Sequence, residues 1–390
     1  MYDFNKLIDR SNSDSFKWGA VEQRFKKPNL LPLWVADMDW ETPDFVMDAL
    51  KHRLEHPVLG YTLDPNDYWP AVIDWVQSHH NWSIKRDWLT YIPGVVKGIG
   101  FAINVFTNPS DKVIIQPPVY HLFRHVTNGL NRTLVNNPLK RVEGGLYEMD
   151  FENLERVADG AKLLVLSNPH NPGGVVWSPQ VLERLAHFCY THDIIVVSDE
   201  IHCDLVLSGY KHTPFATVSP EAEEISITLQ APTKTFNFAG IVSSYAIVPN
   251  EVLRKQYFRW LSAMELNEPN MFAPIATTAA FRKGEPWRKE LLKAIESNID
   301  YVADFCEHNI PQIKVLRPQA SFLVWLDCRG LKLSHRQLVS LFVDKAGLAL
   351  NDGALFGEEG AGYMRLNIGC PQQTIEEALT RLQKAIDNNS

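Results

Sequence analysis

Five short apolar runs in the middle of the chain constrain its fold more than any other feature of the sequence. They are KVIIQ (112–116), KLLVLS (162–167), IIVVS (194–198), ISITLQ (225–230) and SSYAIV (243–248), all rich in Val, Ile and Leu. Because polar residues do not alternate within them, the runs suit β-strands covered on both faces, as in a parallel sheet between layers of helices.

The segment between the second and third runs has the pattern of a crossover helix. Ser178 suits an N-cap, Pro179 suits the first helical turn, and Leu182, Leu185 and Cys189 share one face. A strand, a helix and a second strand form a βαβ unit, so the sequence predicts a large α/β domain.

A smaller unit is predicted after residue 285. Pro286 begins a long amphipathic helix, followed by a strand at 321–328, a helix from 334 that ends at Gly347, a strand at 363–369 and a last helix from about residue 373. We therefore expect an arm at 1–45 that contributes to the small domain, a large domain at 46–285 and a small α+β domain at 286–390.

Composition and charge limit the class of protein. The net charge of −8 over 390 residues argues against direct nucleic-acid binding. No apolar run approaches the ~20 residues of a membrane span. The five cysteines lie far apart, without the pairing of a zinc site or a disulfide framework. We expect a soluble cytoplasmic protein that binds no metal.

Polar residues follow the predicted strands at the points where these end. Asn171 follows the run at 162–167, Asp199 and His202 follow the run at 194–198, and Lys234 follows the run at 225–230. Gly94 turns another strand into a helix and leaves the first amides of that helix unpaired, those of Val95, Val96 and Lys97. Each has an ordinary structural explanation alone. However, ligands bind where the carboxyl ends of parallel strands meet.

Together these residues supply what pyridoxal 5′-phosphate (PLP) requires of a protein. Lys234 offers an amine that burial keeps neutral and able to react with an aldehyde. Asp199 offers a carboxylate that keeps the pyridine nitrogen protonated, Asn171 offers an amide for the 3-oxygen of the ring, and His202 is placed to reach the same edge. The free amides after Gly94 offer a phosphate site at a helix N-terminus.

Several segments resemble those of one enzyme family. Asn171, Asp199 and Lys234 follow one another at intervals of 28 and 35 residues, in the order of fold type I PLP enzymes. LPLWVADMDW (31–40), SNPHNPGG (167–174), SDEIHCDL (198–205), APTKTFNFAG (231–240) and MRLNIGCP (364–371) resemble the MalY/PatB-type cystathionine β-lyases of the class I/II aminotransferase superfamily. The resemblance runs from residue 1 to residue 385.

This resemblance implies a fold, an assembly and a set of roles. The fold would be that of fold type I, with a mostly parallel seven-stranded sheet between helices and a smaller α+β domain. The assembly would be a homodimer with shared active sites. Lys234 would bind PLP covalently, with Asp199 and Asn171 on the ring. The other implied site residues are Tyr120 stacked on the ring, Thr233 and the neighbouring subunit's Tyr61 at the phosphate, and Arg365, Trp34 and Ala36 at the substrate.

Two positions depart from the pattern of fold type I aminotransferases. Those enzymes usually carry a serine three residues before the lysine and an arginine eight residues after it, where this chain has Ala231 and Val242. Phosphate binding would then depend on Thr233, the Gly94 loop and Tyr61, and a classical aspartate aminotransferase is disfavoured.

The predicted reaction is a carbon–sulfur β-elimination. Lys234 would remove the Cα proton, and a thiolate on the β-carbon would leave, so that L-cystathionine or another S-substituted L-cysteine gives pyruvate, ammonia and a thiol. Tyr120 is the candidate proton donor to the sulfur. The alternatives are an aminotransferase with the same cofactor site, and a MalY-like regulator that acts on a partner protein.

Two further pairs are given structural interpretations. His121 and His125 lie one helical turn apart but lack a third metal ligand, so a core or surface pair is favoured. Asp37 and Asp39 are paired carboxylates, for which a turn or capping role is favoured over acid–base work.

Overall fold

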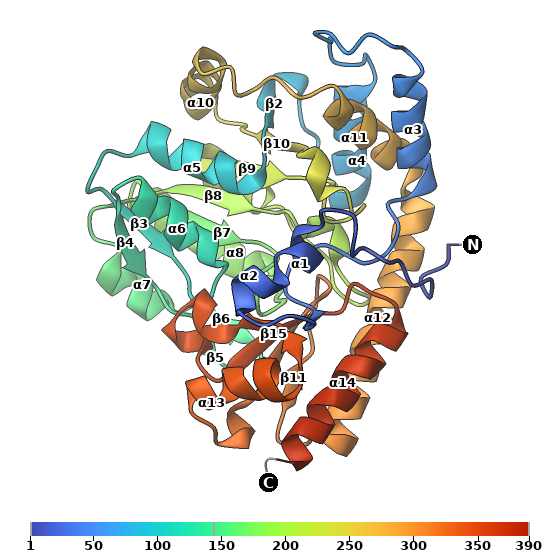
Figure 1. The fold of residues 1–390 in the computed structure, drawn as a ribbon. Coiled ribbons are helices and arrows are strands. Elements are labelled where there is room, and N and C mark those ends of the chain that lie inside the picture. Colours follow the sequence, from blue (N-terminus) through green and yellow to red (C-terminus); the bar gives the residue numbers. More distant parts are fainter. Residues whose placement is uncertain (1, 143–144, 389–390) are drawn as a thin grey trace.

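A computed structural model describes residues 2–142 and 145–388, which fold around two main sheets (Figure 1). Residue 1, residues 143–144 and residues 389–390, which belong to the predicted arm and the two predicted domains, lie outside the described residues. The domain limits at residues 45 and 285 stay a prediction. Among the described helices, none has the length and apolar character that crossing a membrane requires.

The large sheet has seven strands in the spatial order β2-β10-β9-β8-β7-β3-β4, and only β10 runs antiparallel to its neighbours. This confirms the predicted mostly parallel seven-stranded sheet, and the five apolar runs all belong to it. The strands are β2 (Leu89–Ile92), β3 (Lys112–Ile115), β4 (Thr133–Asn136), β7 (Ala161–Ser167), β8 (Ile195–Asp199), β9 (Ser226–Gln230) and β10 (Ser244–Ile247).

Successive side chains of the central strands pack against different helices. Leu163 and Val165 of β7 lie in one core with α5 (Val95–Phe106), α6 (His121–Gly129) and α10 (Glu251–Ala263). Leu164 and Leu166 lie in a second core with α7 (Phe151–Val157), α8 (Pro179–Thr191) and α9 (Pro220–Ile225). Because strand side chains alternate between faces, both faces of the sheet are buried, as the lack of polar alternation predicts.

The small sheet is antiparallel, in the order β11-β12-β15-β14. The predicted helix from residue 334 is correct only in its first part. After α13 (His335–Ser340) the chain forms one π-helical turn at Leu341–Lys345, which buries three successive side chains that an α-helix would spread over several faces. The strands are β11 (Lys314–Leu316), β12 (Leu323–Asp327), β14 (Asn351–Asp352) and β15 (Tyr363–Asn367), and the long helices are α12 (Glu285–Asn309) and α14 (Gln372–Asp387).

The N-terminal segment joins the two parts. Its strand β1 (Leu31–Pro32) pairs with β13 (Leu348–Ala349), and helices α1 (Phe16–Gly19) and α2 (Val21–Phe25) lie across the front of the molecule, in dark blue in Figure 1. Beyond it, α3 (Asp44–Leu54) and α4 (Tyr68–His80) pack against α11 (Phe272–Lys283). A short hairpin, β5 (Lys140–Arg141) with β6 (Tyr147–Glu148), completes the described strands.

A buried ion-pair cluster holds the N-terminal segment in place. Asp39 Oδ2 lies 2.6 Å from Lys17 Nζ, and Asp39 Oδ1 lies 2.6 Å from Arg10 Nη1 and accepts a hydrogen bond from Trp18 Nε1. Asp37 Oδ2 lies 2.8 Å from Arg10 Nη2. The capping role predicted for these two aspartates is wrong, because their carboxylates neutralise cations of the N-terminal arm, including the fully buried Lys17.

The same aspartates lie within a strap, residues 34–40, that crosses the carboxyl edge of the large sheet. Side chains on both sides hold its backbone. Asn351 Nδ2 donates to the Trp34 carbonyl, Asn367 Nδ2 donates to the Val35 and Asp37 carbonyls, and Asn237 bonds the backbone of Met38 and Trp40. Asn237 follows Lys234 by three residues, so the strap is tied both to the loop of Lys234 and to the small sheet.

We expect Asp39→Asn to lower the free energy of unfolding by about 3 kcal/mol, because it removes the close partner of the buried Lys17 ammonium and leaves only the Asp37 carboxylate, 3.9 Å away. Chemical denaturation of the purified protein measures the change. Glu41→Gln is the matched control two residues away, since the Glu41–Lys6 pair is exposed and its loss should leave stability unchanged. Equal stabilities for both variants would contradict the importance of the buried pair.

Candidate functional site

A cavity of about 310 Å³ lies where the central strands of the large sheet end. Asp199 is the last residue of β8, Asn171 and Lys234 each follow the end of a strand by four residues, and α5 begins after β2 at the same edge. Ten of the residues singled out in the sequence line it: Ala36, Gly94, Val95, Val96, Tyr120, Asn171, Asp199, His202, Thr233 and Lys234. The strand ends therefore bring one set of polar groups together.

The Lys234 side chain lines this cavity, and its amine contacts the backbone of the strap. Its Nζ donates a hydrogen bond to the Ala36 carbonyl. Burial lowers the pKa of the amine to about 8, and the nearby Arg365 cation adds to the lowering, while the Asp37 and Asp199 carboxylates oppose it. A substantial fraction of this amine is thus neutral near neutral pH, as a nucleophile or a base requires.

Asp199 is a buried carboxylate without an ion-pair partner among residues 2–142 and 145–388. Its Oδ1 accepts a hydrogen bond of 3.1 Å from the Ile201 amide. Burial raises the pKa of its carboxyl to about 7. A neighbouring cation, such as a protonated ring nitrogen, stabilises the charged form of a buried carboxylate, because its attraction offsets the lost solvation.

Asn171 and Arg365 form a pair beside the cavity. Arg365 Nη1 donates to Asn171 Oδ1 at 3.0 Å, which leaves the amide nitrogen of Asn171 available to another acceptor. Arg365 Nη2 donates to the Trp34 carbonyl, and its buried Nε has no partner. Burial lowers the pKa of this guanidinium to about 10. Because no carboxylate of the described chain pairs with it, Arg365 suits a carboxylate brought by a ligand.

His202 and Tyr120 provide the remaining polar groups of the walls. The Nδ1 atom of His202 is buried without a partner, and burial lowers the pKa of the imidazole to about 3, so the ring is neutral. Burial raises the pKa of Tyr120, so its hydroxyl remains protonated. Both side chains can therefore donate or accept a hydrogen bond to a ligand in the cavity.

The other end of the cavity suits an anion. The amides of Val95, Val96 and Lys97 open α5, a helix of 12 residues, and lack intrahelical acceptors. Thr233 lies nearby, and Ser243 and Ser244, which the sequence reasoning missed, line the same cavity. The sequence does not reveal them because β10 is antiparallel. The start of this strand therefore lies at the edge of the sheet where the parallel strands end. Ser167, the last residue of β7, also went unnoticed.

Two predicted residues lie apart from the cavity. Tyr61 is fully exposed on the loop after α3. The Trp34 ring packs between Phe16 and Phe25, and only its backbone carbonyl contacts Arg365. The Trp34 side chain therefore packs within the N-terminal segment and does not line the cavity. At the departures from the family pattern, Ala231 is buried and Val242 lines the cavity, so no arginine stands at the anion-binding end.

The cavity residues fit PLP by their chemistry. The site offers an amine with a lowered pKa, a carboxylate without a cation, an unpartnered histidine nitrogen and a helix N-terminus with free amides. An aldehyde, a pyridine nitrogen, a ring oxygen and a phosphate would each satisfy one of these groups.

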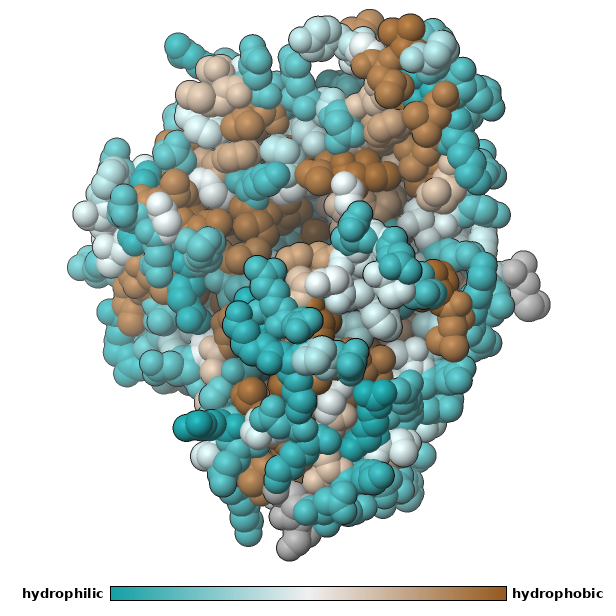
Figure 2. Space-filling model, in the orientation of Figure 1, coloured by the Kyte–Doolittle hydropathy of each residue, from teal (hydrophilic) through white to brown (hydrophobic). Residues whose placement is uncertain are grey.

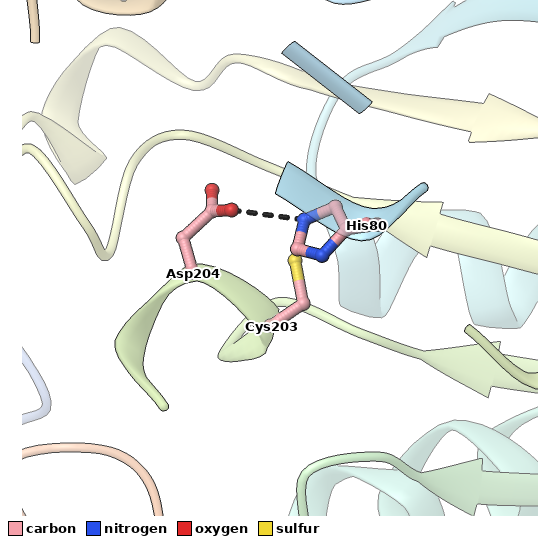
Figure 3. A group of neighbouring side chains, drawn as sticks. All are labelled: His80, Cys203 and Asp204. Carbon is pink, nitrogen blue, oxygen red and sulfur yellow. Dashed lines mark hydrogen bonds and ion pairs between the residues drawn. The ribbon is translucent and has the colours of Figure 1, made fainter. Parts of the chain in front are cut away.

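A second polar cluster lies deeper, between α4 and the turn at Cys203–Leu205 (Figure 3). His80, Cys203 and Asp204 are all buried, with potential ligand atoms within 4.8 Å of one another. However, Asp204 Oδ1 already accepts hydrogen bonds from His80 Nε2 at 3.0 Å and from Trp75 Nε1 at 3.1 Å. Burial raises the pKa of the Cys203 thiol well above its ordinary value. The cluster is thus a hydrogen-bonded histidine–aspartate pair beside a neutral thiol, which suits a structural role.

Comparisons with known proteins agree with the fold and with the site. The chain is 40% identical to the cystathionine β-lyase PatB of Bacillus subtilis over 98% of its own length and 99% of that protein. A PLP-bound protein from Clostridium difficile 630, described as an aminotransferase, has a similar structure, with a TM-score of 0.97. The two chains are 42% identical, and the match covers 99% of this chain and all of the other.

A further structure has the same fold and a related name. Cystalysin from Treponema denticola, which contains PLP, matches with a TM-score of 0.96 and 33% identity over the full length of both chains. The predicted resemblance to the cystathionine β-lyases is confirmed. The family described as aminotransferase class I and II matches residues 28–382. The chain therefore belongs to the aminotransferase class I and II family.

Proposed function

We propose that this protein is a PLP-dependent carbon–sulfur β-lyase that converts L-cystathionine or a related S-substituted L-cysteine, with water, into pyruvate, ammonia and a thiol. The observation that carries the proposal is the likeness, over nearly the whole chain, to a protein named as a cystathionine β-lyase. The cavity supports it, because the Lys234 amine and the Asp199 carboxylate line one space, and Arg365 lies beside it, bonded to the cavity residue Asn171.

We assign the cofactor contacts as follows. Lys234 is the lysine that binds PLP, Asp199 pairs with the ring nitrogen, and Asn171 uses its free amide nitrogen on the 3-oxygen. His202 borders the same edge of the ring, and Tyr120 stacks on the ring face. The first amides of α5, together with Thr233, hold the phosphate.

The chain's own groups then divide the work of the reaction. PLP, when bound, supplies the electron sink that makes breaking the Cα–H and Cβ–S bonds accessible. Arg365 holds the α-carboxylate, which orients the Cα–H bond toward Lys234 Nζ, the general base. Tyr120 Oη keeps its proton because burial raises its pKa, and it is the group we assign to protonate the departing sulfur.

Two other functions fit the same chain. An aminotransferase would use the same cavity and would need a keto acid as acceptor, and the name of the matching family favours it as the second candidate. A regulator that binds a partner protein would not need Lys234. We also propose a cytoplasmic location, since all five cysteines are buried and unpaired.

Pyruvate release tests the proposed function directly. We expect PLP-loaded protein to release pyruvate from L-cystathionine over many turnovers without any added keto acid, as measured by a coupled lactate dehydrogenase assay. Lys234→Ala should reduce turnover by about 1000-fold or more, because the general base is lost. A single turnover that resumes only when a keto acid is supplied would identify an aminotransferase instead.

The acidity of Lys234 predicts a pH profile in the cofactor-free protein. The neutral amine is the reactive form, so its acylation rate should rise with pH and reach half its maximum near pH 8. Quantitative mass spectrometry of the Lys234 peptide measures the rate, and the exposed Lys51 in the same digest corrects for decay of the reagent. A midpoint near pH 10, the value of about 10.4 for a free lysine, would contradict the effect of burial.

We further propose a homodimer that places Tyr61 at the phosphate of the partner's site. The last residue of α3 and the loop after it expose several large hydrophobic or aromatic side chains, and Figure 2 shows a brown patch at the upper right, where α3 lies. Exposed apolar patches of this kind mark interaction sites. The side chains are Leu54, Val58, Leu59, Tyr61 and Leu63.

Tyr61→Phe should weaken PLP binding about 10-fold without changing the thermal unfolding of the protein, because it removes one hydrogen bond to a charged group. Equilibrium dialysis measures the affinity, and sedimentation velocity measures the oligomeric state. Tyr210→Phe is the control, since Tyr210 is also exposed but lies outside this loop. An unchanged affinity, or a monomer with full PLP affinity, would rule out the shared site.

A further inference from the structure

Three basic residues beside the cavity, His121, Arg124 and Arg24, form a group that we call the basic rim. His121 and Arg124 lie in the first turn of α6, directly after the cavity residue Tyr120, and Arg24 lies in α2. Figure 1 shows α2 lying across the front of the molecule, and Figure 2 shows a recess with hydrophobic walls above this place.

His121 connects the rim to the substrate side of the cavity. Its ring centroid lies 5.0 Å from that of Tyr120 and 6.1 Å from that of Phe356. The Arg365 guanidinium lies 4.9 Å from the centroid of the same Phe356 ring. His121 and Arg365 are therefore neighbours around one phenylalanine. His121 Nδ1 is buried and has no hydrogen-bond partner.

The two arginines of the rim are also without acid partners. Within residues 2–142 and 145–388, neither Arg124 nor Arg24 forms an ion pair. Arg124 Nη2 lies near Gly357, 3.8 Å from the position that a Cβ atom would take on this glycine. The exposed Glu359 carboxylate lies near the same glycine but forms no ion pair with Arg124. The Arg24 guanidinium lies 5.7 Å from the centroid of the Trp34 ring, and the Trp34 carbonyl accepts from Arg365.

The positive charges act together on His121. Burial lowers the pKa of its imidazole to about 4, and the cations of Arg365, Arg24 and Arg124 add to the lowering. The imidazole is therefore neutral at neutral pH and the arginines supply the charge. Arg24 is exposed and Arg124 partly exposed, and neither is paired with an acid within residues 2–142 and 145–388, so both can attract an anion to this position.

We propose that the basic rim binds a second carboxylate, at the far end of the substrate's sulfur chain. The protein would then prefer S-substituted cysteines whose side arm ends in a carboxylate over those whose side arm is neutral. This inference rests on the proposed lyase activity, because the α-carboxylate is assigned to Arg365. A second anion must then find its cations elsewhere, and the rim, next to Tyr120, is where the sulfur substituent would extend.

A pair of substrates of equal size tests the proposal. S-(2-carboxyethyl)-L-cysteine carries a terminal carboxylate, and S-(2-carbamoylethyl)-L-cysteine carries a neutral amide in its place. We expect kcat/KM of the holoenzyme for the acid to exceed that for the amide by about 10-fold or more, as hydrogen bonds to charged groups predict. The difference should lie in KM, because the rim does not touch the reacting atoms.

Variants locate the preference. Arg124→Gln and Arg24→Gln should each lower the acid-to-amide ratio, and the double variant should bring it close to one. Arg336→Gln is the matched control, because Arg336 is an exposed arginine on α13 that does not belong to the basic rim, and it should keep the wild-type ratio. A ratio near one in the wild type, or an unchanged ratio in the double variant, would overturn the proposal.

Binding gives a readout that does not depend on turnover. Calorimetric titration of PLP-loaded Lys234→Ala should show tighter binding of the acid than of the amide, and the difference should disappear when both arginines are replaced. If neither compound yields pyruvate but the binding difference remains, the lyase proposal fails and the rim proposal stands. Equal binding of the two compounds overturns the rim proposal whatever the activity.

Discussion

The structure depends on a buried ion pair between Lys17 and Asp39. Burying two charges costs several kcal/mol per ion unless each finds close partners, and Asp39 meets this requirement with Lys17, Arg10 and the Trp18 indole. The ion pair also determines the position of a neighbouring segment. The pair fixes the strap, and the strap presents the Ala36 carbonyl to the Lys234 amine. A cluster outside the cavity thus determines where the amine points.

The cavity itself follows the opposite principle. Within residues 2–142 and 145–388, Asp199, Lys234 and Arg365 form no ion pairs, and burial shifts the pKa of each so that the neutral form is favoured. Such groups reduce the stability of the free protein, and a ligand that carries the complementary charges relieves the cost. The tightly paired arm and the incompletely paired cavity therefore have different tasks, since the first provides rigidity and the second provides binding energy.

The extent to which the sequence predicts this site follows from the direction of the strands. Lys234, Asp199 and Asn171 come after parallel strands, and strand ends can be read from apolar runs. Ser243 precedes β10 and Ser244 begins it, and no local pattern reveals the antiparallel direction of this strand. The ion pairs of Asp37 and Asp39 join residues 20 to 29 positions apart. The two aspartates lie in an irregular segment, where neither period 2 nor period 3.6 applies. The role that we propose for Tyr61 requires a second chain, so neither a single sequence nor a single subunit can establish it.

The backbone at Val242 shows how the anion-binding end functions without an arginine. Val242 has a φ of 58° and a ψ of 64°, a left-handed conformation that costs a β-branched residue about 1–3 kcal/mol. The Tyr91 hydroxyl donates to the Val242 carbonyl at 2.8 Å and offsets part of this cost. The bend carries the chain into β10 with Ser243 and Ser244 lining the cavity. Helix amides, small hydroxyls and the exposed Lys97 thus surround the position assigned to the phosphate, so its charge is met by many weak donors in place of one strong cation.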